Sequence, residues 1–398
     1  MLLRTRDSVK KRKVVIVGAG PAGSSLAIRL ARAGSDVVLI ERERFPRPKL
    51  CGEFISPECL RHFEQLGAYP AMRASGGARI LETRFYDRKE RSITVPSKWF
   101  HSGANALSLS RLRMDECLLD AAKTEGVEVH EDTAAIRVAV ENEHLAELVV
   151  RGEAGERSIE GDIFIDATGR ASVLAKLLAK ASRKGKPNLA KPPYVAFKGH
   201  LAADNLGRDV CEIYSFDGGY GGLSPVEHGL ANLCFIVKST VARAFGGDAE
   251  RLMSDVVCRN PRASFILREA AVESEWLAVA IEGFGRNVLR PALNVFAIGD
   301  AGGFIDPFTG SGILMALESS EILAACISDS PIDLNALEKA YERKYKERFG
   351  RRLKLCSILR SAAFHPNIAS AAISLLGVSK NAREYLAKRT RGEYIGEN

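Results

Sequence analysis

A glycine-rich turn follows the first apolar segment of the chain. Residues 13–17 are predicted to form a short buried strand, and Gly18-Ala19-Gly20-Pro21-Ala22-Gly23 comes directly after it. In this spacing the first glycine permits a tight turn, the second lets the backbone approach a pyrophosphate, and the third lets the next helix pack on the sheet. That helix, predicted to run to about Ala33, offers the free N–H groups of its first turn to phosphate oxygens. The turn therefore predicts a dinucleotide site.

An acidic residue completes this unit. Residues 36–40 are predicted to form a second buried strand, and Glu41 lies at its end, where a carboxylate can accept hydrogen bonds from two ribose hydroxyls. A Gly-x-Gly-x-x-Gly pattern alone is a weak signal. The succession of strand, turn, helix, strand and acid is typical of a nucleotide-binding βαβ unit.

A second group of residues points to a flavin. Residues 294–298 are predicted to form an apolar strand, and Gly299-Asp300-Ala301-Gly302-Gly303-Phe304-Ile305-Asp306-Pro307 follows it. Asp300 could accept a hydrogen bond from a ribityl hydroxyl. Thr309-Gly310-Ser311-Gly312-Ile313 then opens an apolar helix that is predicted to end near Ile327. The N-terminus of that helix can place N–H groups at the flavin pyrimidine, where reduction builds negative charge.

The remaining elements must position these two turns. Residues 184–193 are predicted to be a linker, residues 194–237 are β-rich with a glycine cluster at 218–222, and the chain from Leu334 onward is helical with a break at His365-Pro366. We predict an α/β protein with a Rossmann-type, glutathione-reductase-like FAD-binding fold, an inserted β-sheet substrate domain and a helical C-terminus. The predicted boundaries are an FAD-binding domain at 1–79, 106–190 and 281–330, a substrate domain at 80–105 and 191–280, and a C-terminal helical region at 331–398.

Composition narrows the function classes. The 398 residues carry a net charge of +8, yet no recognised nucleic-acid-binding motif accompanies it, and an anionic cofactor, an acidic substrate or an anionic membrane surface would suit the charge equally well. The eight cysteines contain no Cys-x-x-Cys pair and the histidines no His-x-x-x-His pair, which argues against a metal site or a disulfide framework. No segment resembles a transmembrane helix, and residues 1–13 lack the apolar core of a secretory signal, so we expect a cytoplasmic protein.

Together these motifs resemble the flavoprotein superfamily that contains p-hydroxybenzoate hydroxylase, geranylgeranyl reductases and flavin-dependent halogenases. Two further motifs contribute to the resemblance, Asp166-Ala167-Thr168-Gly169-Arg170-Ala171-Ser172 and Arg111-x-x-Met114-Asp115-x-x-Leu118. The resemblance covers roughly residues 13–327 and implies FAD as cofactor. The residues that we expect to bind it are Gly18, Gly20, Pro21, Ala22, Gly23, Glu41, Arg42, Arg111, Asp300, Gly310, Gly312 and Ile313. A second full Gly-x-Gly-x-x-Gly is absent, so a separate NAD(P)H domain of the disulfide-reductase kind is not expected, although NAD(P)H remains a candidate electron donor.

The geranylgeranyl reductase branch fits best. Phe45-Pro46-Arg47-x-Lys49-x-Cys51-Gly52 resembles its loop after the second strand, and Asp306-Pro307-Phe308-Thr309-Gly310-Ser311-Gly312-Ile313 resembles its flavin-contacting turn. Gly219-Tyr220-Gly221-Gly222-Leu223-Ser224-Pro225 stands where that branch has Tyr-x-Trp-x-Phe-Pro, without the tryptophan, and Thr168-Gly169 replaces its usual Asp-Gly.

The other branches fit less well. The Trp-x-Trp-x-Ile-Pro signature of the halogenases is absent, since the only tryptophans are Trp99 and Trp276. The aromatic hydroxylases usually carry Gly-Asp-Ala-Ala-His, and here Gly302-Gly303 occupy the last two places.

Several single residues have more than one interpretation. Cys51 and Tyr220 are candidate catalytic residues, since a thiol or phenol beside the flavin could donate a proton or a hydrogen bond, but each could equally be a packing residue. Arg47 and Lys49 could meet a pyrophosphate or an anionic substrate, or form a solvated charged loop. Three histidines have no partner identifiable from sequence and are expected at surface or satisfied core positions, namely His200, His228 and His365.

We therefore expect an FAD-dependent oxidoreductase that reduces or dehydrogenates a hydrophobic, isoprenoid or polyketide-like molecule by hydride transfer through flavin N5. The alternatives are a monooxygenase acting through a flavin C4a-hydroperoxide, a halogenase and a non-catalytic flavoprotein. The expected partner is a hydrophobic small molecule, with no nucleic acid. The helix predicted from Leu334 is basic and amphipathic, with Tyr341, Tyr345 and Phe349 at helical spacing, so it either packs on its own domain or contacts the inner face of a membrane.

Overall fold

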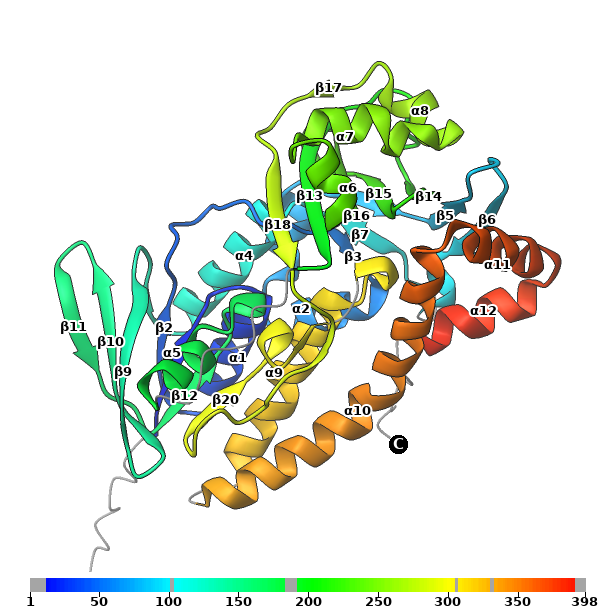
Figure 1. Ribbon diagram of the computed structural model, residues 1–398. Coiled ribbons are helices and arrows are strands. Elements are labelled where there is room, and N and C mark those ends of the chain that lie inside the picture. The colour runs from blue at the N-terminus through cyan, green and yellow to red at the C-terminus, as the bar shows by residue number, and fades with distance from the viewer. Residues whose placement is uncertain (1–11, 101–103, 183–191, 305–306, 330–332, 391–398) are drawn as a thin grey trace, which may run out of the picture.

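Two large sheets, three smaller ones and a set of C-terminal helices form most of the described part of the protein (Figure 1). The computed structural model describes residues 12–100, 104–182, 192–304, 307–329 and 333–390. The predicted linker at 184–193, the basic N-terminus and Asp306 of the flavin-contacting motif therefore lie largely or wholly outside the described residues.

The first sheet is parallel throughout, in the order β20-β12-β1-β2-β8. Its strands are β20 (Val295–Ala297), β12 (Ile163–Asp166), β1 (Lys13–Val17), β2 (Asp36–Ile40) and β8 (Glu128–His130). Val14 of β1 is in register with Val37 of β2 and Ile163 of β12. Because crossover connections cover both faces of such a sheet, its strands are continuous apolar runs, which is what the sequence shows for β1 and β2.

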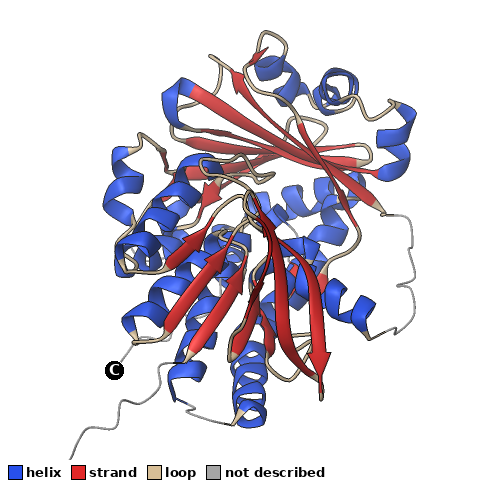
Figure 2. Ribbon diagram, turned by 90° about the vertical axis from the view of Figure 1, so that its left-hand side faces the viewer, coloured by secondary structure: helices blue, strands red, loops and turns tan. Residues whose placement is uncertain are grey.

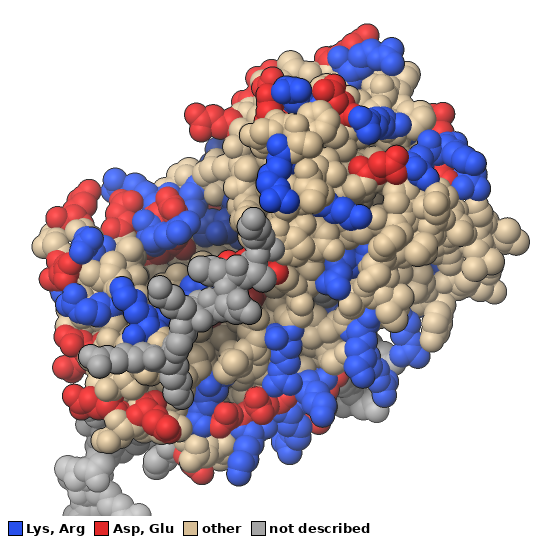
Figure 3. Space-filling view, viewed as in Figure 1, with Lys and Arg blue, Asp and Glu red and all other residues tan. Residues whose placement is uncertain are grey.

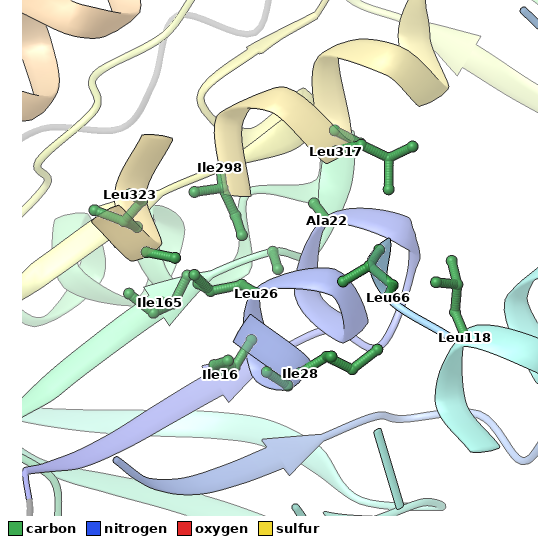
Figure 4. Close-up of a cluster of buried hydrophobic side chains, with 14 of the residues drawn as sticks. Ile16, Ala22, Leu26, Ile28, Leu66, Leu118, Ile165, Ile298, Leu317 and Leu323 are labelled. Carbon is green, nitrogen blue, oxygen red and sulfur yellow. The ribbon is translucent and has the colours of Figure 1, made fainter. Parts of the chain in front are cut away.

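Alternate side chains of β1 enter different cores. Val14 and Ile16 pack under helices, whereas Val15 and Val17 pack against a small antiparallel sheet and one helix. The helices of the first face are α1 (Pro21–Arg32), α4 (Arg111–Thr124) and α9 (Gly312–Asp329). The second face is covered by α5 (Val173–Ala181), β9 (Ala134–Glu141), β10 (His144–Gly152) and β11 (Gly155–Ile159) (Figure 2). Figure 4 shows the first core, in which Leu26 of α1 meets Ile298 and Ile165.

The second sheet has eight strands and is mostly antiparallel. Its order is β17 (Ala271–Val272), β13 (Tyr194–Ala202), β16 (Leu230–Lys238), β15 (Gly219–Pro225), β14 (Val210–Phe216), β5 (Glu82–Tyr86) and β6 (Ser92–Pro96), with β18 (Leu277–Ile281) also pairing with β13. Phe197 and Phe235 face a core shared with α6 (Ser239–Ala244), α7 (Ala249–Asp255) and α8 (Pro261–Leu267). Ala196 and Ile236, one residue along each strand, face a cavity between the two sheets.

Short elements join the two sheets. They are β3 (Phe54–Ile55), β7 (Ala106–Ser108), β4 (Ala78–Ile80), β19 (Gly285–Arg286), β21 (Gly303–Phe304), α2 (Pro57–Gln65) and α3 (Tyr69–Ala74). The predicted α/β fold with a parallel FAD-type core is confirmed, and strands 82–96 and 194–281 form the inserted sheet. The exact domain boundaries stay a prediction.

Three helices complete the chain, α10 (Leu334–Ala363), α11 (Pro366–Val378) and α12 (Lys380–Arg389). The break between α10 and α11 falls at the predicted His365-Pro366. Tyr341, Tyr345 and Phe349 of α10 are buried against α9 and the first core, so this apolar face packs within the protein and cannot contact a membrane. None of the described helices combines the length and the apolar character needed to cross a bilayer.

Candidate active site

The glycines of the first turn have separate structural roles. Gly18 has a φ of +104°, and a Cβ there would lie 2.5 Å from the Ala167 carbonyl oxygen. A Cβ on Gly23 would lie 1.8 Å from the Gly18 carbonyl oxygen, so only glycine lets α1 pack this close to the turn. A Cβ on Gly20, by contrast, would meet nothing closer than Arg111 Nη2 at 3.8 Å. The space beside Gly20 is therefore open and faces the guanidinium of Arg111; we call this space the cradle.

Glu41 is fixed at the end of β2. Its Oε2 accepts a hydrogen bond of 2.8 Å from the Ala19 amide and lies 3.5 Å from Arg47 Nη2. Its Oε1 accepts from the Glu43 amide at 3.2 Å. The carboxylate is buried and lines the cavity, which places it where the sequence predicts the ribose acceptor. Arg42, the next residue, also lines the cavity but is exposed and pairs with Glu43.

Cations surround the cradle. Arg111, the first residue of α4, forms two hydrogen bonds of 2.7 Å with the Asp115 carboxylate, and Arg47 reaches the same carboxylate at 3.2 Å. Arg47 is buried, so its interpretation as part of a solvated loop is wrong. Burial and the neighbouring charges of Arg47, Arg111 and Arg42 lower the pKa of Lys49 to about 8. An anion in the cradle would relieve this repulsion.

The second turn faces the same space from the opposite side. Asp300 is half-buried at the cavity wall, and among the described residues its carboxylate accepts no hydrogen bond. Burial raises the pKa of Asp300, and the charges of Arg170, Arg111 and Lys49 oppose that rise. Gly310, Gly312 and Ile313 also line the cavity, and a Cβ on Gly312 would meet nothing within 4 Å. The N–H groups of the first turn of α9 therefore face open space.

The third motif, residues 166–172, contains a residue that stabilises the fold. The Asp166 carboxylate accepts hydrogen bonds from the amides of Thr168, Leu174 and Ala175 and from the Thr168 hydroxyl, so it holds the first turn of α5. The residues between the two ends of this motif, 167–171, line the cavity, among them Arg170, whose guanidinium stacks 5.1 Å from the Phe304 ring.

A cavity of about 1410 Å³ connects all these residues. Beyond the second turn its wall becomes apolar and aromatic, formed by the exposed side of the eight-stranded sheet and by α10–α12. Ring contacts link five aromatic side chains of this wall into a continuous series by way of Phe364 and Tyr194, which do not line the cavity; the five are Phe85, Phe308, Tyr220, Phe284 and Phe304. Tyr220 is nearly fully buried in this wall. The Cys51 thiol also lines the cavity beside Arg111, and its sulfur accepts a hydrogen bond of 3.4 Å from the Glu53 amide.

One buried charge cluster was missed from sequence. Glu53, wholly buried at the cavity wall with a left-handed φ of +56°, contacts Lys198 Nζ at 2.6 Å and His200 Nε2 at 2.7 Å. Its Oε1 also accepts from the Arg111 amide at 2.8 Å. His200 therefore has a hydrogen-bond partner that could not be identified from sequence, as fits a satisfied position; the adjacency of Glu53 to Cys51-Gly52 was the one available signal. His365 bonds the Ser361 carbonyl at the surface, and His228 is exposed, as expected of them.

The residues present fit FAD. An open glycine cradle faced by guanidinium groups, a fixed carboxylate at the end of β2, an unpaired carboxylate at Asp300 and a free helix N-terminus all border one cavity. The comparison with protein families agrees, because residues 11–328 match the FAD binding domain family. The chain belongs to this family. FAD is accordingly the cofactor of this protein, which is an FAD-dependent oxidoreductase.

Relatives of known name carry out different reactions. The chain is 27% identical over 417 residues to the menaquinone reductase of Mycobacterium tuberculosis, across 95% of this chain and 94% of that protein. It is 26% identical over 350 residues to the tryptophan 2-halogenase of Chondromyces crocatus, a match that spans 65% of the halogenase. A geranylgeranyl bacteriochlorophyll reductase-like structure from Thermoplasma acidophilum aligns with a TM-score of 0.77 at 21% identity, covering 94% of this chain and 95% of that one, and shows the shared fold.

Proposed function

We propose that this FAD-binding protein reduces or dehydrogenates a hydrophobic isoprenoid or polyketide-like molecule. The observation that carries the proposal is the apolar, aromatic half of the cavity, which continues directly from the turn at Gly310 and Gly312. A long apolar substrate could lie there with one of its double bonds beside the flavin. The menaquinone and geranylgeranyl reductase names among the relatives support this substrate class.

The cofactor would be held by residues of both turns. Gly20 and the N-terminus of α1 would receive the pyrophosphate, Glu41 the ribose, and Asp300 the ribityl chain. Arg111 would face the cofactor while Asp115 fixes its guanidinium. Bound FAD supplies two-electron chemistry by exchanging a hydride at N5.

Reduction of an alkene also requires a proton, and two side chains of the cavity wall can donate one. The Cys51 thiol lies beside Arg111 on the cofactor side, and the Tyr220 phenol lies in the aromatic wall on the substrate side. Both were the candidate catalytic residues from sequence, and both line the cavity.

The hydroxylase alternative has a steric obstacle in this chain. A Cβ on Gly302 would lie 2.9 Å from the Ala297 carbonyl oxygen, and a Cβ on Gly303 would lie 2.6 Å from the Tyr345 hydroxyl of α10. The Ala-His pair of the aromatic hydroxylases therefore cannot occupy these positions without moving α10 or the turn. This packing favours a reductase over an aromatic hydroxylase.

Product analysis tests the proposal. The holoenzyme would be incubated with dithionite as electron source and with menaquinone or geranylgeraniol, and the products analysed by mass spectrometry. We expect a gain of two hydrogen atoms in the isoprenoid chain, which remains after the quinone ring has been reoxidised in air, since dithionite alone reduces only the ring. A product that instead gains an oxygen atom under air, or a halogen in the presence of bromide, would overturn the assignment.

A further inference from the structure

One cation stands in the apolar half of the cavity, away from the cofactor cradle. Arg383 belongs to α12, and among the described residues of α11 and α12 that line the cavity it alone is charged. The neighbouring lining residues from these helices are apolar, namely Ala369, Ala372, Ile373, Leu376, Leu386 and Ala387. A charge in such a wall is costly to leave uncompensated.

The charge of Arg383 has no counterion within the described chain. No carboxylate lies within ion-pair distance of its guanidinium among the described residues, and its Nε is buried without an acceptor. Its Nη1 donates to the carbonyl oxygens of Leu376 at 2.7 Å and Gly377 at 3.1 Å, at the end of α11. These two bonds hold the guanidinium in place but leave its net charge unneutralised.

The helix that carries Arg383 is attached to the flavin-facing turn. Ser311 Oγ, in the turn before α9, donates to the Thr390 carbonyl oxygen at 3.3 Å, at the C-terminal end of α12. Seven residues separate Thr390 from Arg383, and the rise of an α-helix makes that separation about 10 Å along the axis. The other end of this segment is fixed as well, because Gly377 packs near Ile93 of β6, which also lines the cavity.

We infer that Arg383 binds an oxyanion, a carboxylate or a phosphate, at the end of an apolar substrate. This inference rests on the proposed function and narrows its substrate class to anionic amphiphiles. A guanidinium pairs with either oxyanion through charge-assisted hydrogen bonds, and the apolar wall around it strengthens that attraction. The head group lies about 10 Å from the turn at Ser311, so the substrate chain extends from Arg383 toward the flavin.

The competing explanation is that Arg383 only caps the C-terminus of α11. A capping arginine is expected to affect stability but not to discriminate between ligands. The test is therefore a comparison of head groups on one chain length, with decanoate, decyl phosphate and decanol as probes. Binding to the holoenzyme is measured by isothermal titration calorimetry, and flavin occupancy is checked by absorbance in every sample.

We expect decanoate and decyl phosphate to bind at least about tenfold more tightly than decanol, as for a hydrogen bond to a charged group. In Arg383→Gln the preference is expected to fall to within about twofold, while Arg383→Lys keeps most of it. Lys380→Gln removes the same charge from an exposed site on the same helix and is expected to leave the preference unchanged.

Equal binding of the three probes by the unmodified enzyme would overturn the inference, as would a preference that survives in Arg383→Gln or is lost in Lys380→Gln. Because the first of these outcomes needs no variant, a misfolded Arg383→Gln protein does not prevent the test. Failure of the proposed function would look different: anionic probes would still be preferred, but no isoprenoid, with or without a carboxylate or phosphate head group, would gain hydrogen.

Discussion

Glu53 Oε2 lies 2.7 Å from His200 Nε2, which joins the loop after Cys51-Gly52 to strand β13 of the inserted sheet. The other carboxylate oxygen contacts Lys198 Nζ at 2.6 Å and the Arg111 amide at 2.8 Å. The cofactor-binding half and the substrate half of the cavity are therefore connected through one buried carboxylate. The left-handed backbone of Glu53 is retained because these contacts hold it there.

Glu53→Gln should destabilise the protein strongly. The substitution leaves the Lys198 ammonium buried without a counterion, which costs roughly 3–5 kcal/mol in free energy of unfolding. Urea denaturation of the two proteins measures this difference. Glu58→Gln is the control, because both carboxylate oxygens of Glu58 are buried without a partner among the described residues, and removal of that charge should cost nothing. A loss below about 1 kcal/mol in Glu53→Gln would contradict the role given to this cluster.

The same cluster predicts a pH dependence of stability. Burial alone would raise the pKa of Glu53, but His200 and Lys198 lower it below the ordinary value of 4.5. A depressed folded-state pKa contributes stability that is fully present above the unfolded-state pKa and is lost as the pH falls through the folded-state value. The free energy of unfolding should therefore fall below about pH 4.5 more steeply in the unmodified protein than in Glu53→Gln. If the free energy of unfolding fell equally steeply at acid pH in both proteins, Glu53 would not be the origin of this pH dependence.

Gly20→Val should give a folded protein without flavin. The nearest atom to a Cβ at Gly20 is 3.8 Å away, so the side chain fits the empty cradle but fills the space proposed for the pyrophosphate. The ratio of flavin to protein absorbance after purification, with circular dichroism for folding, measures the outcome. Gly207→Val, at an exposed turn with comparable room, should keep its flavin. Full flavin occupancy in Gly20→Val would show that the pyrophosphate does not bind beside Gly20.

FAD affinity should weaken in mildly alkaline solution. Lys49 has a pKa lowered to about 8 in the protein without flavin, and the anionic pyrophosphate favours its charged form. Above pH 8 binding must then be accompanied by uptake of a proton, so the dissociation constant should rise by up to about tenfold per pH unit above this pKa. Fluorescence titration of the apoprotein with FAD measures it. Lys49→Met should flatten the profile; a slope unchanged in this variant would exclude Lys49 as its origin.

The proton donor can be identified by conservative substitutions. Tyr220→Phe keeps the ring contacts with Phe308 and Phe364 but removes the hydroxyl, and Cys51→Ala removes the thiol beside Arg111. The variant that loses the donor should keep full flavin occupancy and lose about 10²-fold or more in the rate of substrate reduction. Unchanged rates in both variants would assign the proton to another group. Cys117→Ala serves as a control for loss of a thiol, because Cys117 lies on α4 but does not line the cavity.

Membrane contact, one of the two alternatives that the sequence left open for α10, is proposed instead for α11. Its outer face exposes Ile368, Leu375 and Val378, the helix carries no charged residue, and Figure 3 shows a largely uncharged surface at this end of the molecule. Helix α12 beside it has four basic residues and one acidic residue. We expect co-sedimentation with phosphatidylglycerol vesicles rather than phosphatidylcholine vesicles, and its loss when the three apolar residues become serine. Binding that persists in the triple variant would place the contact elsewhere.

The sequence predicted those parts of the site that depend on local backbone geometry. The turns at Gly18–Gly23 and Gly310–Gly312 lie within short segments whose spacing fixes strand, turn and helix, and both line the cavity. The Glu53 cluster and the position of Arg383 depend on contacts between residues more than a hundred positions apart or on the docking of a terminal helix. No periodicity encodes such contacts. The same limitation explains why the sequence could not decide the environment of α10, because its apolar stripe fits a membrane surface and a protein core equally well.

The most direct test of the proposed function concerns what the reduced holoenzyme does with oxygen. Enzyme photoreduced without oxygen would be mixed with aerated buffer in a stopped-flow spectrometer while the flavin spectrum is recorded. For a reductase or dehydrogenase we predict slow, direct return of the oxidised spectrum in a single phase. A resolved absorbing intermediate before the oxidised flavin appears would contradict the account and assign the enzyme to oxygen chemistry.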